Sequence, residues 1–229
     1  MATERGILMS AWSVGRMLAD AKSQTRRPIK GLRAGPWPEG DEFRYTAVYG
    51  GKGEAPGEPY WHFYADDKSY RFTFEKPPLG VPGDLLYCKE ALTETAAHFA
   101  RYAADGKWVE GYETDDHYWK WKRPLLNARF MPKWAARPEL WRRITDVRAQ
   151  RVQEISEADA IAEGVDHGPM RTGWLDYELG PTIMHSVPAE YSFKTLWDSI
   201  YAARGLGFEA NPWVFAYTFE RIERKEASA

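Results

Sequence analysis

The positions of apolar residues predict a strand and a helix at the start of the chain. The run Gly6-Ile-Leu-Met9 predicts a short buried strand, and Ser10 after it is a residue type that caps helices. The next apolar positions recur with the i, i+3, i+4, i+7 spacing of one helix face: Val14, Met17, Leu18 and Ala21. Because Pro28 cannot continue a helix, we expect this helix to end near residues 19–22 and segment 22–27 to form its exit turn.

Two further helices and a long strand are predicted in the second half of the chain. Ser156 opens a short helix that ends at Gly164, with these residues facing inward: Ala158, Ile161 and Ala162. Ser192 opens another helix, whose apolar face has the same spacing as the first: Phe193, Leu196, Trp197 and Ile200. Between residues 213 and 222, aromatic residues alternate with smaller ones, which is the period of two expected of a strand.

Two stretches have the composition of insertions. Residues 31–82 are rich in Gly and Pro, and their three aromatic runs, at 43–49, 60–64 and 70–74, predict short strands or hairpins. Residues 166–190 carry Gly and Pro without periodicity and predict an inserted loop.

Between these insertions the pattern is that of strands. Residues 85–89 predict a buried strand, and the turn signal Asp105-Gly106 predicts a hairpin between residues 99–103 and 108–112. Further aromatic or β-branched strands are predicted at 118–121 and 141–147. Strands separated by hairpins favour an α+β fold, with a mostly antiparallel small β-barrel and flanking helices. We expect one domain over residues 1–229, interrupted by the two insertions.

Composition narrows the classes of function. The 229 residues carry a net charge of -2, which gives no overall field for a polyanion and leaves only local basic patches, at 26–30 and 137–151. The 11 Trp, 13 Tyr and 10 Phe exceed the usual content and suit either core packing or stacking of flat ligands. The single Cys88 fits a reducing cytoplasm, and no run is long enough to span a membrane. Five scattered histidines without ligand spacing predict no metal site, and we expect no cofactor.

The segment Lys22-Ser-Gln-Thr-Arg-Arg27 carries the first candidate chemistry. In a helical or turn-like conformation, Lys22 and Thr25 fall on the same side. A desolvated lysine among other cations has a lowered pKa and accepts a proton, so it can activate a neighbouring hydroxyl as a nucleophile. From these residues alone, the alternative is a solvated basic turn.

Glu163 is the second candidate. It falls in the last turn of the predicted short helix, where the helix dipole disfavours an anion and raises the carboxyl pKa. An acid placed badly for stability hints at another role; the alternative is an exposed surface glutamate. Asp159, three residues after Ser156, resembles the second member of a capping box.

Several of these segments together resemble the ASCH domain, a branch of the PUA-like superfamily. The resemblance rests on 17–27, on Gly83-Asp84 with the strand after it, on 131–135, on 144–163, and on two C-terminal segments, 196–200 and 211–214. The insertions 31–82 and 166–190 are not covered. Where the family usually has Gly and a basic residue before the lysine, this chain has Asp20 and Ala21, and Asp tolerates the left-handed turn better than most residues.

The resemblance implies a small β-barrel with helices beside it, and for some bacterial members an amidohydrolase activity on N4-acetylcytidine. The catalytic Lys, Thr and Glu of those members correspond to Lys22, Thr25 and Glu163. We further assign substrate-binding roles to four residues: Gln24, Arg27, Glu90 and Trp134. For Glu90 an ion pair is the alternative, and for Trp134 it is core packing.

Three functions therefore remain open. The first is a cofactor-free N4-acylcytidine amidohydrolase with a small nucleoside substrate, in which Thr25 attacks, Lys22 transfers the proton and Glu163 assists. The second is an RNA-binding PUA-like module that uses Arg26, Arg27 and Arg151, and the third is a ribonuclease. The net charge of -2 weighs against the two functions that need a basic groove. The sequence makes no prediction of the oligomeric state.

Overall fold

A five-stranded sheet is the centre of the protein. The computed structural model describes residues 2–29, 47–49, 59–64, 71–74, 77–94, 100–109, 125–168, 173–180 and 186–223. The sheet has the order β1-β6-β10-β11-β2, with bounds β1 Glu4–Leu8, β6 Leu85–Lys89, β10 Trp141–Arg151, β11 Trp213–Arg221 and β2 Gln24–Pro28. Only β1 and β6 pair in parallel; the other three pairings are antiparallel.

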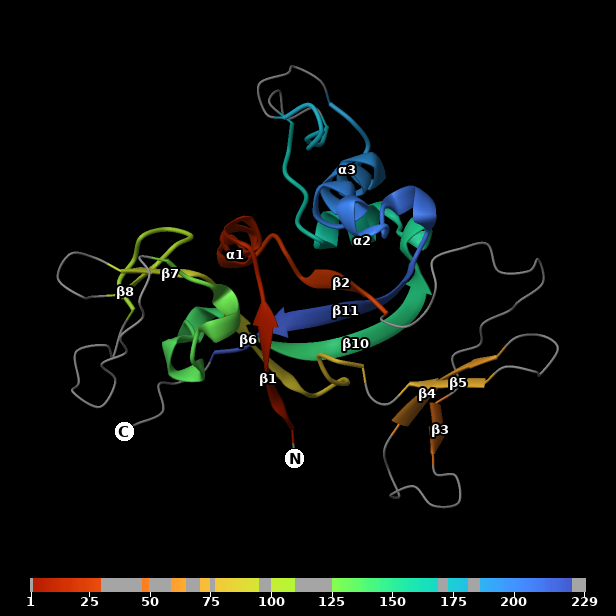
Figure 1. Cartoon of the computed structure of the whole chain (residues 1–229), viewed down its shortest axis with the longest axis horizontal. Coiled ribbons are helices and arrows are strands. Elements are labelled where there is room, and N and C mark those ends of the chain that lie inside the picture. The colour runs from red at the N-terminus through yellow and green to blue at the C-terminus, as the bar shows by residue number, and fades with distance from the viewer. Residues whose placement is uncertain are drawn as a thin grey trace.

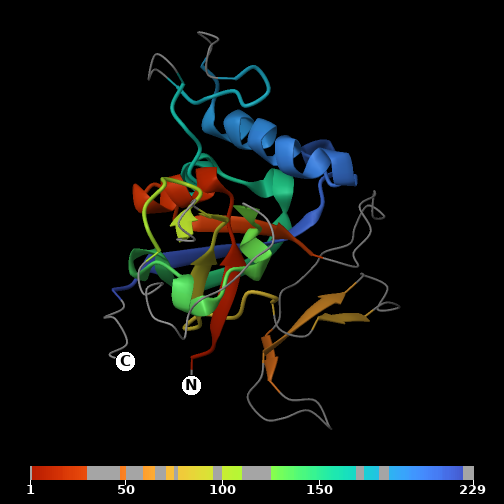
Figure 2. The same ribbon diagram turned by 60° about the vertical axis from the view of Figure 1, so that its left-hand side comes forward.

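Three α-helices lie against this sheet: α1 Ala11–Leu18, α2 Glu157–Ala162 and α3 Ala189–Tyr201. Figures 1 and 2 show α2 and α3 beside the β2–β11 edge, with α1 close to the start of β2. The predicted α+β class is confirmed. In the described part of the chain, β1 and β2 are the two edges of the curved sheet, and no pairing of strands closes it into a barrel.

Both faces of the sheet are covered, and β11 separates two cores. Phe215, Tyr217 and Phe219 point into a core shared with β1, β6 and α1, whereas Val214 packs with α2 and α3 on the other face. Val214 and Ala216 are as fully buried as the aromatic residues between them. The predicted period of two is therefore correct. Successive side chains of β11 point to opposite faces of the sheet, but both faces are buried, and neither is exposed to solvent.

Two helices differ in detail from the prediction. The predicted caps Ser10 and Ser156 are confirmed, because each hydroxyl accepts the N–H three residues on at 3.2 Å. However, α3 begins at Ala189 after Pro188, and Ser192 is a buried residue inside it. In α2 the inward residue is Ala160, while Ile161 is 40% exposed, because only one side of this short helix contacts α3.

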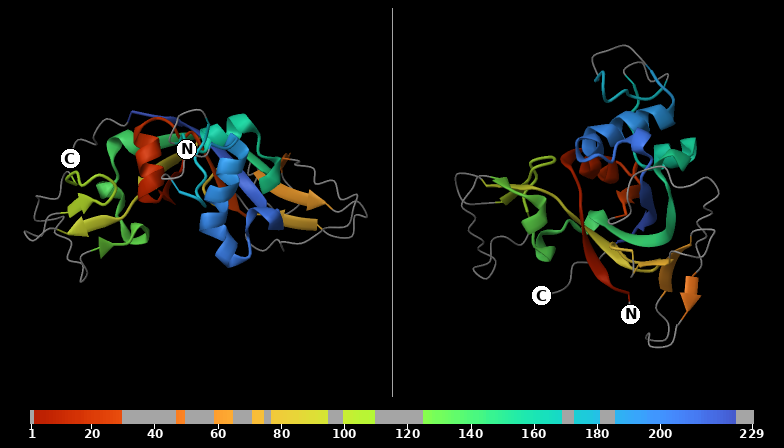
Figure 3. Two further views of the ribbon diagram at one scale, coloured as in Figure 1. Left: turned by 90° about the horizontal axis from the view of Figure 1, so that it is seen from above. Right: turned by 45° about the vertical axis from the view of Figure 1, so that its right-hand side comes forward.

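The remaining strands form two small sheets, which lie on opposite sides of the central sheet (Figure 3). The first contains the described parts of the three predicted aromatic runs of the 31–82 insertion, as β3 Ala47–Tyr49, β4 Pro59–Tyr64 and β5 Arg71–Phe74. The second has the order β8-β7-β9, with bounds β7 Leu92–Glu94, β8 Ala100–Tyr102 and β9 Leu125–Leu126. The Asp105-Gly106 turn is present, with Arg101 bridged to Trp108 across it. Residues 118–121 lie outside the described residues.

Short 3-10 helices connect several of these elements: η2 Ala128–Phe130, η3 Lys133–Ala135, η4 Pro138–Leu140, η5 Val152–Glu154, η6 Ala202–Arg204 and η7 Phe208–Ala210. No helix among the described residues combines the length and the apolar character needed to cross a bilayer.

Candidate active site

The turn after α1 brings Lys22 to the α2 side of the sheet. Asp20 has φ of +51°, in the left-handed region that ends helices, and the Ala21 N–H donates back to the Arg16 carbonyl oxygen at 2.9 Å. The Asp20 carboxylate lies 3.0 Å from Nη1 of Arg221 on β11. Asp20 thus provides the turn for which the resemblance would have placed a glycine, as expected.

Segment 22–27 is not the exit turn that the sequence predicted. Residues 24–28 form the edge strand β2, in which Thr25 pairs with Tyr217 and Arg26 with Ala216 of β11. The pairing with β11 outweighs the polar character of the segment, which hides the strand from a search for apolar alternation. Side chains therefore alternate between the two faces, and the i, i+3 argument for Lys22 and Thr25 does not apply.

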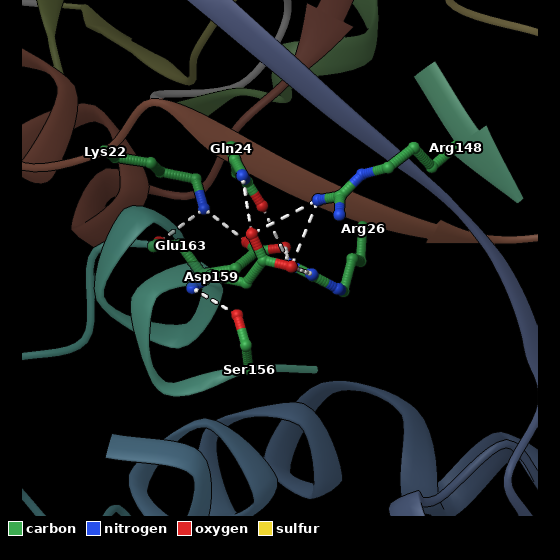
Figure 4. Close-up of polar contacts among 7 residues, drawn as sticks. All are labelled: Lys22, Gln24, Arg26, Arg148, Ser156, Asp159 and Glu163. Carbon is green, nitrogen blue, oxygen red and sulfur yellow. Dashed lines mark hydrogen bonds and ion pairs between the residues drawn. The ribbon is translucent and has the colours of Figure 1, made fainter. Parts of the chain in front are cut away.

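Lys22 and Glu163 form a buried ion pair (Figure 4). The Lys22 Nζ donates to Oε2 of Glu163 at 2.8 Å and to the backbone carbonyl oxygen of the same residue at 2.6 Å. Lys22 is 5% exposed and Glu163 is also 5% exposed. Two residues that are 141 positions apart in sequence are thus held together away from water, which is the setting in which a proton passes between side chains.

Gly164 allows this close approach. Its φ is +88°, and a Cβ built on it would lie 3.0 Å from Cβ of Lys22 and 3.2 Å from the carbonyl oxygen of Ala21. The Ser23 N–H donates to the Ala162 carbonyl oxygen at 2.9 Å, which fixes the start of β2 against the end of α2. The glycine that was predicted only as a helix end also makes room for the lysine stem.

Arg26 and Gln24 continue the cluster along the same face of β2. Arg26 donates from Nη1 to Oε1 of Glu163 at 3.1 Å and from Nη2 to Oδ2 of Asp159 at 2.8 Å. The Gln24 amide donates to Oδ1 of Asp159 at 2.8 Å and accepts from Arg26 at 3.2 Å. Arg148 of β10 reaches Asp159 from the solvent side at 3.1 Å. The predicted substrate-binding residue Gln24 is therefore engaged with protein groups in this structure.

The charges of this cluster set the ionisation of the pair. Burial alone raises the pKa of the Glu163 carboxyl, but Lys22 and Arg26 more than offset that effect, so its pKa lies below the usual value. The expectation of a raised carboxyl pKa from the helix dipole was wrong, because these two cations contact the carboxylate directly. Burial lowers the pKa of Lys22 despite the attraction of Glu163, with Arg27 and Arg26 adding to the fall.

Thr25 and Arg27 leave β2 on the opposite face. Thr25 is 4% exposed, and it pairs with Tyr217 of β11. Arg27 donates to the Leu8 carbonyl oxygen at 2.8 Å. Of the three predicted catalytic residues, the structure brings Lys22 and Glu163 into contact and places the Thr25 side chain on the opposite face of β2.

The two other predicted substrate-binding residues lie elsewhere. The Glu90 carboxylate receives two hydrogen bonds from Arg137, at 2.6 and 3.1 Å, and both residues are buried. Arg137 also binds Asp105 and stacks on Tyr102, with its guanidinium carbon 3.7 Å from the ring centroid. Trp134 is 38% exposed in η3, so the alternative of core packing does not describe it. Glu90 thus has the ion pair that was its alternative role.

A second polar group borders the site on the α1 side. The Lys22 Nζ lies 5.8 Å from the Trp12 ring centroid, and the Trp12 indole N–H donates to Asp166 at 2.5 Å. Arg16 binds the same carboxylate at 3.0 Å and donates to the carbonyl oxygens after Glu163. The Tyr177 hydroxyl also donates to Asp166, at 3.2 Å. The segment that carries Glu163 is thereby anchored to α1.

Sequence reasoning missed Arg26 and Asp159. Arg26 was predicted as a residue that would meet RNA phosphates, yet its side chain is fully buried between two carboxylates. Asp159 was interpreted as part of a capping box, but it precedes Glu163 by four residues and so shares its face of α2. That spacing was the available signal. Arg26, Arg137 and Arg142 are each about 3% exposed or less, so these three cations of the predicted basic patches are not available to phosphates.

Among the described residues, no group of three or more His, Cys, Asp and Glu side chains gathers as a metal site would require. Comparison with known proteins adds little. No known family model and no curated protein matches the sequence. Among solved structures, the chain is similar to a protein of Enterococcus faecalis V583 assigned to the family DUF984, with 10% identity and a TM-score of 0.37 over 100% of this chain and 86% of that one. A likeness this weak carries no functional argument.

Proposed function

We propose that this protein is an amidohydrolase that removes the acyl group from an N4-acylated cytidine or cytosine of the N4-acetylcytidine type. The observation that carries the proposal is the buried pair of Lys22 and Glu163. Hydrolysis of an amide needs a group that takes a proton from the nucleophile and returns one to the departing amine. A lysine whose pKa is lowered by burial suits that task better than an exposed lysine does.

The proposed reaction has two steps. The scheme requires the form of the site in which Lys22 has given up its proton. The Thr25 hydroxyl oxygen then bonds to the acyl carbon, its proton passes to the Lys22 Nζ, and the C–N4 bond breaks as Lys22 protonates the amine nitrogen. Water then attacks the resulting ester; one water proton passes by way of Lys22 to the departing threonine oxygen, which restores the hydroxyl, and acetic acid leaves and ionises to acetate. Glu163 orients this water or holds the cytosine edge. Lys22 and Glu163 enter this scheme on their contact. Thr25, whose side chain leaves β2 on the opposite face, enters it on the resemblance to ASCH proteins alone.

The substrate is a small molecule in this proposal. The net charge is -2, and Arg26, one of the residues expected to meet RNA phosphates, is instead occupied by Asp159 and Glu163. Long nucleic acids are held by exposed cations along a groove. The free thiol of Cys88 is buried and agrees with the reducing cytoplasm in which we place this activity.

The test is a direct assay without added metal. Purified protein is incubated with N4-acetylcytidine, and the release of cytidine and acetate is followed by absorbance and chromatography. N4-methylcytidine, which has no amide, is the matched control compound. The proposal is supported if cytidine is released from N4-acetylcytidine and not from N4-methylcytidine. It is contradicted if no N4-acylcytidine releases cytidine while labelled RNA binds tightly.

A further inference from the structure

We propose that Asp159 is a positioning residue for the Lys22–Glu163 pair and acts on it through Arg26. This inference rests on the proposed function, because it assigns a further residue to the same site. Asp159 contacts neither Lys22 nor the predicted nucleophile Thr25 through any hydrogen bond in the described structure. The hydrogen bonds that connect Asp159 to the pair run through the Arg26 guanidinium, which Asp159 shares with Glu163.

The geometry of Arg26 is that of a bridge between two acids. One terminal nitrogen lies 3.1 Å from Oε1 of Glu163, and the other lies 2.8 Å from Oδ2 of Asp159. Its side chain is 0% exposed, so water does not replace either partner. Gln24 completes the arrangement by binding both Arg26 and Asp159. Figure 4 shows these side chains converging between β2 and α2.

Charge balance explains why the second acid is needed. Lys22 and Arg26 are two cations in a buried space, and Glu163 alone would leave one of them uncompensated. Asp159 supplies the second negative charge, and hydrogen bonds from Gln24 together with Arg26 and Arg148 keep its pKa low against the effect of burial. When Asp159 is ionised, Arg26 binds both Asp159 and the Oε1 atom of Glu163. The Oε2 atom of Glu163 then remains available to accept the hydrogen bond from Lys22.

Every charged group around Lys22 enters this balance. Arg16 approaches from α1 and is paired with Asp166. Arg26 and Arg27 belong to β2, Glu163 and Asp159 belong to α2, and Arg148 reaches Asp159 from β10 with its side chain 43% exposed. Arg148 also lies 3.4 Å from the exposed Asp146. Asp159 is therefore the residue at which the buried cluster meets the solvent-facing charges.

The experiment is a titration of the Lys22 side chain by NMR on lysine-labelled protein without substrate, with Lys22→Arg used to assign the signal. Asp159→Asn removes one negative charge next to Arg26, so the pKa of Lys22 is expected to fall. The control Glu209→Gln removes the same charge from a residue of η7 whose side chain is 80% exposed and lies near Lys194, outside this cluster, so it is expected to leave that pKa unchanged. An unchanged pKa in a folded Asp159→Asn variant, or an equal fall in both, would overturn the proposal.

A second variant keeps the proposal testable should Asp159→Asn fail to fold. Arg148→Gln changes a partly exposed side chain and releases Asp159 to Arg26, so the pKa of Lys22 is expected to rise. A fall or no change contradicts the positioning role. Because the titration needs no substrate, it separates this inference from the proposed activity. If the protein is active, the pH–rate profile of Asp159→Asn should move to lower pH along with the Lys22 titration.

Discussion

The Nζ atom of Lys22 lies 2.8 Å from the Glu163 carboxylate and 2.6 Å from the backbone carbonyl oxygen of the same residue. The second contact holds the ammonium group in place independently of the carboxylate charge. A substitution of the Glu163 side chain can therefore change the electrostatics of the pair while the lysine keeps one hydrogen-bond partner. This separation of position from charge makes the site well suited to mutagenesis.

Gly164→Ala is expected to reduce both stability and activity. The left-handed backbone costs an alanine about 1–2 kcal/mol. The new Cβ would also lie 3.0 Å from Cβ of Lys22 and 3.2 Å from the carbonyl oxygen of Ala21. Gly106→Ala is the control, because Gly106 also has a positive φ, of +72°, but has no atom within 4 Å of a built Cβ. Urea unfolding should show a larger loss for Gly164→Ala, and only that variant should lose cytidine release. Equal losses of stability and activity in the two variants would mean that the close approach of Gly164 to Lys22 has no role.

Thr25 is tested by two substitutions of similar volume. Thr25→Ser keeps the hydroxyl and should retain measurable activity, whereas Thr25→Val keeps the buried shape and should lower kcat at least about 100-fold. Steady-state kinetics on N4-acetylcytidine decides between them. If Thr25→Val retains its rate, the hydroxyl is not the nucleophile, and water activated by Lys22 and Glu163 takes that place.

The Glu90–Arg137 pair is expected to act on stability. Removing one partner of a buried ion pair leaves the other charge uncompensated, so Arg137→Met should lower the free energy of unfolding by about 3–5 kcal/mol. The double variant Glu90→Met/Arg137→Met removes both buried charges and should recover part of that loss. Chemical denaturation measures both changes. A double variant less stable than Arg137→Met would mean that the pair itself is strongly favourable.

The protein should lose stability in acid. The pKa of Asp84 is lowered because hydrogen bonds from the Thr3 and Val81 N–H groups outweigh its burial, and the Asp105 pKa is lowered chiefly by Arg137. A carboxyl with a lowered folded pKa contributes stability that is complete above its unfolded pKa, near 4, and is lost as the pH falls through the folded value.

The free energy of unfolding, measured by denaturation at several pH values, should therefore decline as the pH falls below about pH 4. Asp84→Asn should be less stable than the wild type at pH 6 and should show a shallower decline, because it no longer gains a proton there. A decline that is equally steep in that variant would assign the acid sensitivity to other carboxyl groups.

The elements that the sequence predicted well are those with local signals. Ser10 and Ser156 cap their helices through side chains that bond within the same turn, and the alternation of residues 213–222 marks a strand regardless of its partners. Strand β2 lacks such a local signal. Its side chains are polar, and they are buried only because β11 and α2, which lie far along the chain, pack against it. The α3 start was misplaced because Pro188 fixes it without a side-chain cap.

The candidate site was predictable only in part. The pairing of Lys22 with Glu163 followed from the family resemblance, and their distance in the sequence hides it from local reasoning. The four-residue spacing of Asp159 and Glu163 was the signal available for Asp159, whereas the contacts of Arg26 with both acids depend on β2 facing α2. The Glu90–Arg137 contact likewise joins residues 47 positions apart, which no spacing rule links.

The most direct test of the central claim compares cytidine release from N4-acetylcytidine by the wild type and by Glu163→Gln. The variant keeps the size of the side chain and the Lys22 contact to the backbone carbonyl oxygen, but it loses the charge. The account predicts rapid release by the wild type and a kcat at least about 100-fold lower in a folded Glu163→Gln. A Glu163→Gln variant as active as the wild type, or a wild type that releases no cytidine, would contradict it.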